Sequence, residues 1–210
     1  MILETIPIGM FQSNAYIVGD ETTRACAIID SGEDGRGIEA AVHRLGLTPQ
    51  MLLVTHGHLD HVGGLARLRR AFPGVPIVGS AADRSFFETA AQQGLMFGVR
   101  VEAPPPIDRE LSDGEIVRIG SLELRTIFTP GHSPGGVSFH CEAEKAVFVG
   151  DALFAGSIGR TDLPGGDYGT LIASIRSRLF PLGDDVVVYS GHGPETTIGD
   201  ERETNPFLAE

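Results

Sequence analysis

Three histidines and an aspartate lie within six positions of the segment LVTHGHLDH, which spans residues 53–61. They are His56, His58, Asp60 and His61, and the whole chain has only seven histidines. Imidazole nitrogen and carboxylate oxygen are the ligands that zinc and similar cations take in proteins. Because four side chains from so short a segment cannot all reach one ion, the spacing favours two ions, one bound by His56 with His58 and one by Asp60 with His61.

Three further candidate ligands share one local setting, since each follows an apolar run that ends in glycine. His132 follows TIFTPG, Asp151 follows AVFVG and His192 follows VVVYSG. Ligand sites in α/β proteins commonly lie where strands end, so these side chains are expected to meet the histidine cluster at one edge of the fold. The seven residues together predict a dinuclear metal site. His43 and His140 lack this setting and are expected to be ordinary surface or core residues.

Apolar runs alternate with helical patterns along the whole chain and predict an α/β layered fold. No linker interrupts the pattern, so residues 1–210 are expected to form a single domain. The segment 93–113 is the only long irregular stretch, and it is expected to be either a flap over the site or a packed surface loop. Strands are expected at 3–8, 15–20, 25–32, 51–56, 75–80, 115–120, 122–129, 136–141, 146–151 and 185–192. Helices are expected at 37–45, 62–71, 81–93 and 167–179.

The composition restricts the partners and the compartment. The net charge is −12 and no run of Lys and Arg occurs, which argues against a nucleic-acid partner. Two bound dications would bring this charge to about −8. No apolar run approaches about 20 residues and the first residues carry no signal-peptide pattern, so we expect no membrane association and a cytoplasmic location. Cys26 and Cys141 lie in separate apolar runs and are expected to be buried, unpaired residues.

The string H-x-H-x-D-H with later isolated His, Asp and His resembles the signature of the metallo-β-lactamase superfamily, from IIDSG to SGHGP. This resemblance implies an αββα sandwich, with two mixed sheets flanked by helices and a dinuclear metal site at one edge. It also implies a metal assignment. The first metal would take His56, His58 and His132, the second would take Asp60, His61 and His192, and Asp151 would bridge them. Asp30, which ends ACAIID, matches a recurrent family aspartate near the metals. It is expected either to orient a ligand histidine or to serve as a turn residue.

Two adjacent metal ions point to hydrolysis, with Asp60 placed to orient the attacking hydroxide. The segment GDALFAGSIGRTDLPGGD resembles the glyoxalase II group and its short bacterial relatives. That likeness implies hydrolysis of S-2-hydroxyacylglutathione, such as S-lactoylglutathione, to a hydroxy acid and glutathione. Zinc is the expected metal, and iron or manganese also suits such ligands. Arg160, nine residues after Asp151, matches a basic residue that contacts glutathione, and its alternative partner is Asp162.

Two other functions fit the same motif. A persulfide dioxygenase shares the H-x-H-x-D-H string and a similar GRTD, and uses one iron held by two histidines and an aspartate. The segment LPGGD favours the hydrolase over this alternative. A non-catalytic metal-binding scaffold module is the third possibility. Antibiotic hydrolysis is not expected, because the best-known zinc β-lactamases have cysteine where this chain has Asp151.

Overall fold

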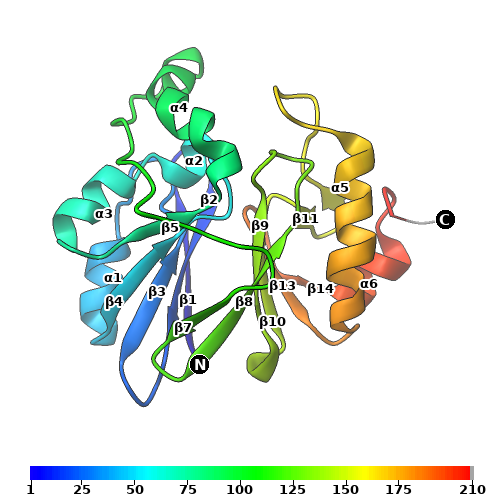
Figure 1. Ribbon diagram of the computed structural model, residues 1–210, viewed down its shortest axis with the longest axis horizontal. Helices are drawn as coiled ribbons and strands as arrows, with labels where there is room; N and C mark the ends of the chain where they lie inside the picture. Colours follow the sequence, from blue (N-terminus) through cyan, green and yellow to red (C-terminus); the bar gives the residue numbers. More distant parts are fainter. Residues whose placement is uncertain (209–210) are drawn as a thin grey trace.

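The computed structural model describes residues 1–208, which form two six-stranded sheets packed face to face with helices on both outer sides (Figure 1). The expected αββα sandwich is confirmed. Both sheets mix parallel and antiparallel pairs.

The first sheet has the strand order β1-β2-β3-β4-β5-β6. Its strands β1 to β3 pair antiparallel and β3 to β6 pair parallel. The carboxyl ends of β3, β4 and β5 therefore meet at one edge. The bounds are β1 (Ile2–Ile8), β2 (Ser13–Gly19), β3 (Ala25–Ile29), β4 (Thr48–Leu53), β5 (Ile77–Gly79) and β6 (Arg109–Glu110).

The second sheet has the order β14-β13-β10-β9-β8-β7, and only β10 and β13 pair parallel. This pattern points β8, β10 and β13 the same way, so their ends also share an edge. The bounds are β7 (Ile116–Ile119), β8 (Leu122–Phe128), β9 (Val137–Cys141), β10 (Ala146–Gly150), β13 (Val187–Ser190) and β14 (Thr196–Thr197). A small hairpin, β11 (Leu153–Phe154) and β12 (Ser157–Ile158), follows β10.

Helices α1, α3 and α4 accompany the first sheet, and α5 and α6 cover the second (Figure 1). The bounds are α1 (Ile38–Leu45), α2 (Leu59–Val62), α3 (Leu65–Ala71), α4 (Arg84–Met96), α5 (Tyr168–Ser174) and α6 (Ile198–Thr204). Helix α5 continues as a π-helical segment, Ile175–Leu179, and a 3₁₀ turn, Phe180–Leu182. Other 3₁₀ turns are Ala81–Asp83 and Glu142–Glu144. Within residues 1–208, no helix has the length and apolar character needed to cross a bilayer.

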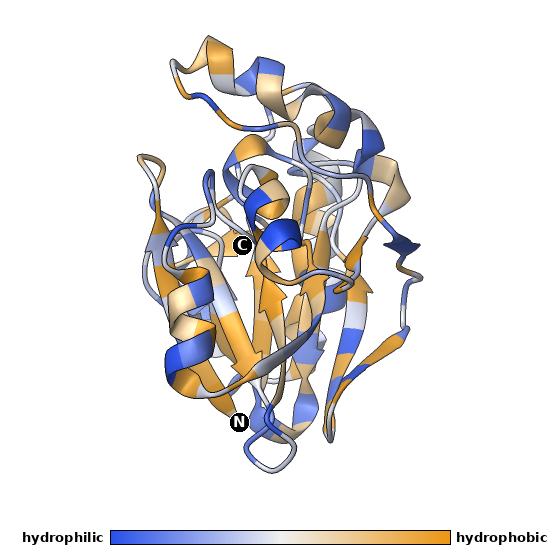
Figure 2. Cartoon of the chain, turned by 90° about the vertical axis from the view of Figure 1, so that its left-hand side faces the viewer, coloured by the Kyte–Doolittle hydropathy of each residue, from blue (hydrophilic) through white to orange (hydrophobic). Residues whose placement is uncertain are grey.

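Three hydrophobic cores separate the four layers. The central core packs the inner faces of the two sheets and includes Tyr16, Ile29, Phe139 and Phe148. The two outer cores pack the sheets against their helices. Strands β2, β3, β9 and β10 are buried on both faces, and the strands are accordingly largely hydrophobic in Figure 2. The central core draws on both halves of the chain, which supports the expected single domain; that organisation stays a prediction.

The two cysteines lie in this framework as expected, since Cys26 and Cys141 are both buried and unpaired. Burial raises the pKa of the Cys26 thiol to about 12. A thiol in this state is a poor nucleophile and a poor metal ligand.

The helix expected at 62–71 is wrong in its bounds, because Gly63 and Gly64 separate α2 from α3. The amide of Gly64 donates to the carbonyl of Gly32, and a Cβ on Gly64 would collide with the backbone of Gly35. The break is therefore set by a close approach of two backbones, and it leaves α2 as a single turn carrying Asp60 and His61.

The irregular segment expected at 93–113 is also shorter than predicted. Helix α4 continues through Gly94 to Met96, and β6 pairs with β5 within the expected loop. Gly94 lies against the carbonyl of Val99, where a Cβ would come within 2.7 Å, so this glycine serves close packing within the helix. The helix ends instead near Gly98, whose φ of 73° is typical of a residue that follows a helix C-terminus.

The hydroxyl of Tyr16 links the two sheets by donating to the carbonyl of Ser190 at 2.5 Å. Tyr16→Phe should lower the free energy of unfolding by about 1 kcal/mol, because Asn14 Nδ2 still donates to that carbonyl after the change. Urea denaturation measures this effect. Tyr189→Phe is the matched control, since the Tyr189 hydroxyl makes no hydrogen bond within residues 1–208. An equal loss of unfolding free energy in both variants would contradict a stabilising hydrogen bond between Tyr16 and Ser190.

Candidate metal centre

The seven predicted ligands converge at the edge of the sandwich where α2 and α4 lie, uppermost in Figure 1. Each is delivered by the end of a strand or by the turn that follows it. His56 and His58 follow β4, Asp60 and His61 lie in α2, His132 follows β8, Asp151 follows β10 and His192 follows β13. The structure thus brings together residues that are up to 136 positions apart in the sequence.

Two of the glycines before these ligands are required by close packing. A Cβ on Gly150, whose φ is 53°, would come within 2.5 Å of Thr55 Oγ1. A Cβ on Gly191 would collide with Asp151 Oδ1 and approach the ring of His61 to 2.8 Å. Any larger residue at these positions would displace a ligand or its support.

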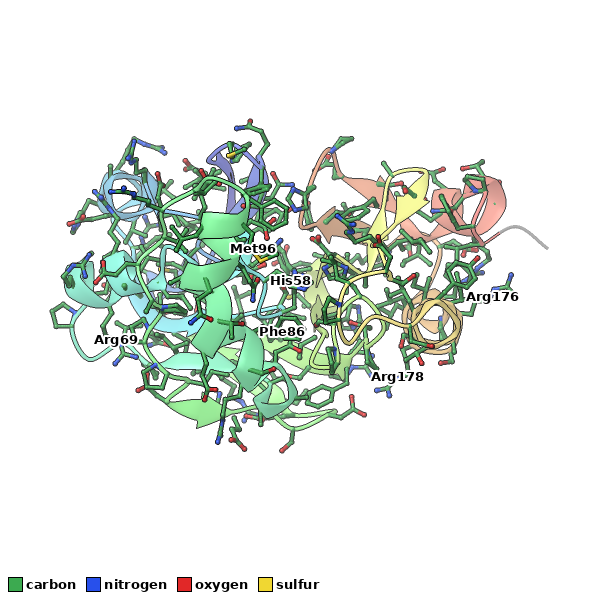
Figure 3. The ribbon with its side chains drawn as sticks, turned by 90° about the horizontal axis from the view of Figure 1, so that it is seen from above. His58, Arg69, Phe86, Met96, Arg176 and Arg178 are labelled. Atoms are coloured by element: carbon green, nitrogen blue, oxygen red, sulfur yellow. The ribbon has the colours of Figure 1, made fainter. Side chains whose placement is uncertain are left out.

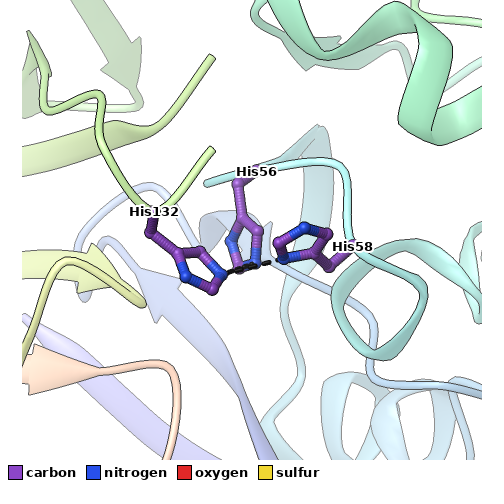
Figure 4. Close-up of side chains that lie close together, drawn as sticks. All are labelled: His56, His58 and His132. Carbon is purple, nitrogen blue, oxygen red and sulfur yellow. Dashed lines mark hydrogen bonds between the residues drawn. The ribbon is translucent and has the colours of Figure 1, made fainter. Parts of the chain in front are cut away.

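The first donor set consists of His56, His58 and His132, all buried (Figure 4). Nε2 of His132 lies 2.8 Å from Nδ1 of His58 and 3.2 Å from Nε2 of His56. Burial, with the neighbouring histidines, lowers the pKa of His58 to about 4 and holds the pKa of His56 well below its ordinary value. The rings of His56 and His58 are therefore neutral, and one proton cannot satisfy the three nitrogens that face one another. A cation between them accepts all three lone pairs.

Hydrogen bonds on the far side of the rings set which nitrogen is free. Nδ1 of His132 donates to the carbonyl of Arg160 at 2.8 Å. Nδ1 of His56 lies 3.1 Å from Thr55 Oγ1, whose own proton goes to Asp30. With Nδ1 carrying the proton, Nε2 of His56 and Nε2 of His132 are left as lone pairs that face the centre, whereas His58 faces it with Nδ1.

The second donor set consists of Asp60, His61 and His192. Asp60 Oδ2 lies 3.2 Å from Nε2 of His192 and 3.6 Å from Nε2 of His61. Burial alone would lower the pKa of His61, but the surrounding carboxylates, led by Asp60 and Asp151, outweigh it and hold that pKa well above its ordinary value. The carboxylates thus give this half of the centre a negative potential, which favours a cation.

Asp151 lies between the two sets. Its Oδ1 is 3.3 Å from Nε2 of His61, and its Oδ2 is 3.5 Å from Nε2 of His192 and 3.6 Å from Nε2 of His132. Within residues 1–208, Asp151 Oδ1 and His61 Nε2 are buried without a hydrogen-bond partner. Buried polar atoms without partners are costly unless another group satisfies them. These residues therefore fit a pair of cations that share Asp151.

Asp30 lies directly behind both sets and has a left-handed φ of 59°. Its carboxylate accepts from the amide and the hydroxyl of Thr55, at 2.8 and 2.6 Å, and lies 2.8 Å from Nδ1 of His61. The side chain is thus engaged with a ligand histidine and with the threonine that supports another. Its orienting role stays a prediction.

Arg160 meets the metal centre in a way that the sequence did not indicate. Its guanidinium pairs with Asp162 through two contacts of 2.8 Å, and both side chains are more than half exposed. Its carbonyl, in contrast, accepts from the ligand His132. Asp162, the alternative partner of Arg160, therefore binds its guanidinium in the structure. Substrate binding by the guanidinium stays a prediction.

Helix α4 supplies an apolar border that sequence reasoning missed. The rings of Phe86 and His58 pack edge-on with their centroids 5.0 Å apart, and Figure 3 shows His58 close to Phe86 of α4 in the view from above. Just beyond the C-terminal end of α4, Phe97 packs against Phe11, whose carbonyl lies 3.1 Å from Nδ1 of His192. Apolar residues in a helical pattern carry no signal that they border a metal centre.

The remaining two histidines lie outside both sets, as expected. His43 is exposed on α1. His140 is buried on β9, where its Nδ1 lies 3.4 Å from Arg125 Nη2. It lines a groove on the outer face of the second sheet, beside Glu142.

Comparison with known proteins identifies the family of this chain. Residues 8–192 match the model of the metallo-beta-lactamase superfamily. Hydroxyacylglutathione hydrolase GloC of Haemophilus influenzae is 43% identical over 99% of this chain and 98% of its own. Among solved structures, the B3 metallo-beta-lactamase BLEG-1 superposes with a TM-score of 0.92 and 38% identity, covering all of both chains. The di-iron-bound form of TTHA1623 superposes with a TM-score of 0.90 and 38% identity, covering 98% of this chain and all of that one. The chain, whose buried His and Asp cluster could hold metal ions, belongs to the metallo-β-lactamase superfamily.

Proposed function

We propose that this protein is a metal-dependent thioesterase that hydrolyses S-2-hydroxyacylglutathione, with S-lactoylglutathione as its substrate. The observation that carries the proposal is the assembly of two complete donor sets around Asp151, which is the arrangement that two-metal hydrolysis requires. The 43% identity to a hydroxyacylglutathione hydrolase over nearly the full length of both chains supports the substrate.

The cofactor would be two divalent ions. Zinc suits the mixture of imidazole and carboxylate, and iron or manganese suits it as well, in keeping with the di-iron form of a structural relative. His56, His58 and His132 would hold the first ion, Asp60, His61 and His192 the second, and Asp151 both. When bound, the ions polarise an acyl oxygen and make water nucleophilic at neutral pH.

The chain's own groups contribute orientation and charge. Asp60 lies at the centre with its Oδ2 toward His192, so its carboxylate would orient the attacking water as well as bind the second ion. Thr55, Asp30 and the carbonyls of Phe11 and Arg160 keep the histidines in place during turnover. The leaving thiolate needs no strong acid, because thiols have a pKa of about 8.5.

The first test is metal content. Elemental analysis of gently purified protein should find two ions per chain. Asp151→Ala should retain less than one, because its carboxylate serves both donor sets. His140→Ala is the control and should keep both ions, since it lies outside both sets. Fewer than one ion in the wild type, after incubation with zinc, iron or manganese, would contradict the centre.

The second test is the reaction. Thiol release from S-lactoylglutathione, followed with a chromogenic thiol reagent, should depend on the bound metal. Asp60→Asn should abolish most of this release, because it removes both the carboxylate that orients the attacking water and a ligand of the second ion. Oxygen uptake with glutathione persulfide and no thiol release would favour the dioxygenase. Metal binding without either reaction would favour the scaffold. Hydrolysis of a β-lactam at a higher rate than S-lactoylglutathione would assign the centre to antibiotic hydrolysis.

The third test concerns Arg160. Glutathione carries carboxylates remote from the thioester, and an arginine can bind one in substrate and transition state alike. Arg160→Ala should therefore raise KM by roughly twofold to fivefold with little change in kcat, since an exposed guanidinium is screened by solvent. A thioester without carboxylates should not respond.

Asp162→Ala provides the control for Arg160. It breaks the ion pair but leaves the guanidinium, so it should not raise KM. An equal rise in KM in both variants would mean that the pair acts by holding the loop, and the carboxylate contact would be wrong.

A further inference from the structure

Asp83 is a buried carboxylate that lies between two ligand-bearing loops. It ends the 3₁₀ turn before α4 and is only 1% exposed. Its Oδ2 accepts from the amide of Gly57 at 2.9 Å and from the hydroxyl of Ser133 at 2.7 Å. Its Oδ1 accepts from the amide of Gly135 at 2.7 Å. No predicted role was attached to this residue, which the sequence placed within a helix.

The three donors identify what Asp83 holds together. Gly57 lies between the ligands His56 and His58, and Ser133 directly follows His132. These loops supply the whole first donor set. The packing is tight, because a Cβ on Gly135 would come within 2.7 Å of the Asp83 carboxylate. The second donor set is supported from elsewhere, by Asp30 and by the carbonyl of Phe11.

We propose that Asp83 is a positioning residue that sets the metal affinity of the first donor set and leaves the second unaffected. By fixing the loop of His56 and His58 against the loop of His132, it holds three imidazoles at the spacing one cation requires. Such supporting contacts typically change metal affinity by about tenfold to a hundredfold. The inference rests on the two-ion centre proposed above and is independent of the substrate.

Asp83→Asn is the direct test, since it keeps the shape of the side chain. A carboxylate accepts hydrogen bonds on both oxygens, whereas an amide accepts on one side and presents N–H donors on the other. At least one amide of Gly57 or Gly135 is then left facing a donor. In a chelator titration read as metal per chain, one ion should be lost at about tenfold to a hundredfold lower chelator concentration, and the other should be unchanged.

Asp20→Asn is the matched control. Asp20 is 3% exposed and also accepts two amides and one hydroxyl, from Thr22, Ser121 and Thr23. It follows the far end of β2, away from the metal edge. This variant should lose stability and keep the metal affinity of both sets. Ser133→Ala removes only one of the three hydrogen bonds to Asp83, so it should lower the affinity for the first ion by less than Asp83→Asn does.

A double variant identifies the ion that responds. In a His58→Ala background, which removes one ligand of the first set, adding Asp83→Asn should not change the affinity of the remaining ion. Three outcomes would overturn the proposal. The remaining ion could bind more weakly in the double variant, both ions could be lost equally in Asp83→Asn, or Asp20→Asn could lower the metal affinity as much as Asp83→Asn does. Because the titration contains no substrate, failure of thioester hydrolysis leaves this result unaltered.

Discussion

The metal centre depends on the acceptors that hold the outer nitrogen of its histidines. The carbonyls of Arg160 and Phe11 engage His132 and His192, and Asp30 engages His61. Such contacts are expected to restrict the orientation of a ring and so to aim its other nitrogen at the centre, and for Asp30 this role stays a prediction. These acceptors come from the turn after β1, the end of β3 and the loop that follows β12. The sandwich therefore has to bring distant segments into register before the site exists.

The two halves of the centre differ in their electrostatics. Burial among other imidazoles lowers the pKa values of His56 and His58, which leaves these two rings as neutral nitrogen donors. Near Asp60 and Asp151 the pKa of His61 is raised, so without metal this histidine is protonated. An ion entering the second set must displace that proton, and its affinity therefore falls as the pH is lowered. Because His56 and His58 are already unprotonated, metal binding by the first set has a weaker dependence on pH near neutrality.

The sequence predicted the sandwich and the residues that gather at its edge as candidate ligands, because both depend on features visible in single residues. Imidazoles and carboxylates after apolar runs marked the ligands, and alternating strands and helices marked the layers. Predictions failed where tertiary packing decided the outcome. Gly94 reads as a helix end but packs within α4, and Gly63 with Gly64 divides an otherwise continuous helical pattern. Strand β14 and helix α6 were missed because their apolar signals are short.

The supports of the centre were harder to predict than its ligands. A backbone carbonyl has no identity in the sequence, so the contacts made by Phe11 and Arg160 could not be predicted from residue type. Asp83 gave no signal because the sequence placed it within the helix expected at 81–93, where an aspartate is usually a solvated surface residue. Thr55 adjoins His56 in the motif, and that adjacency was the only available clue to its contact with the ring.

The central claim is that the inner nitrogens of these histidines hold two cations. Anomalous diffraction from crystals of the zinc-loaded protein tests it most directly. The account predicts two peaks flanking Asp151, one of them about 2.0–2.1 Å from Nε2 of His56, Nδ1 of His58 and Nε2 of His132. A single peak, or a His132 ring turned so that Nδ1 faces the metal and its bond to the Arg160 carbonyl is broken, would contradict it.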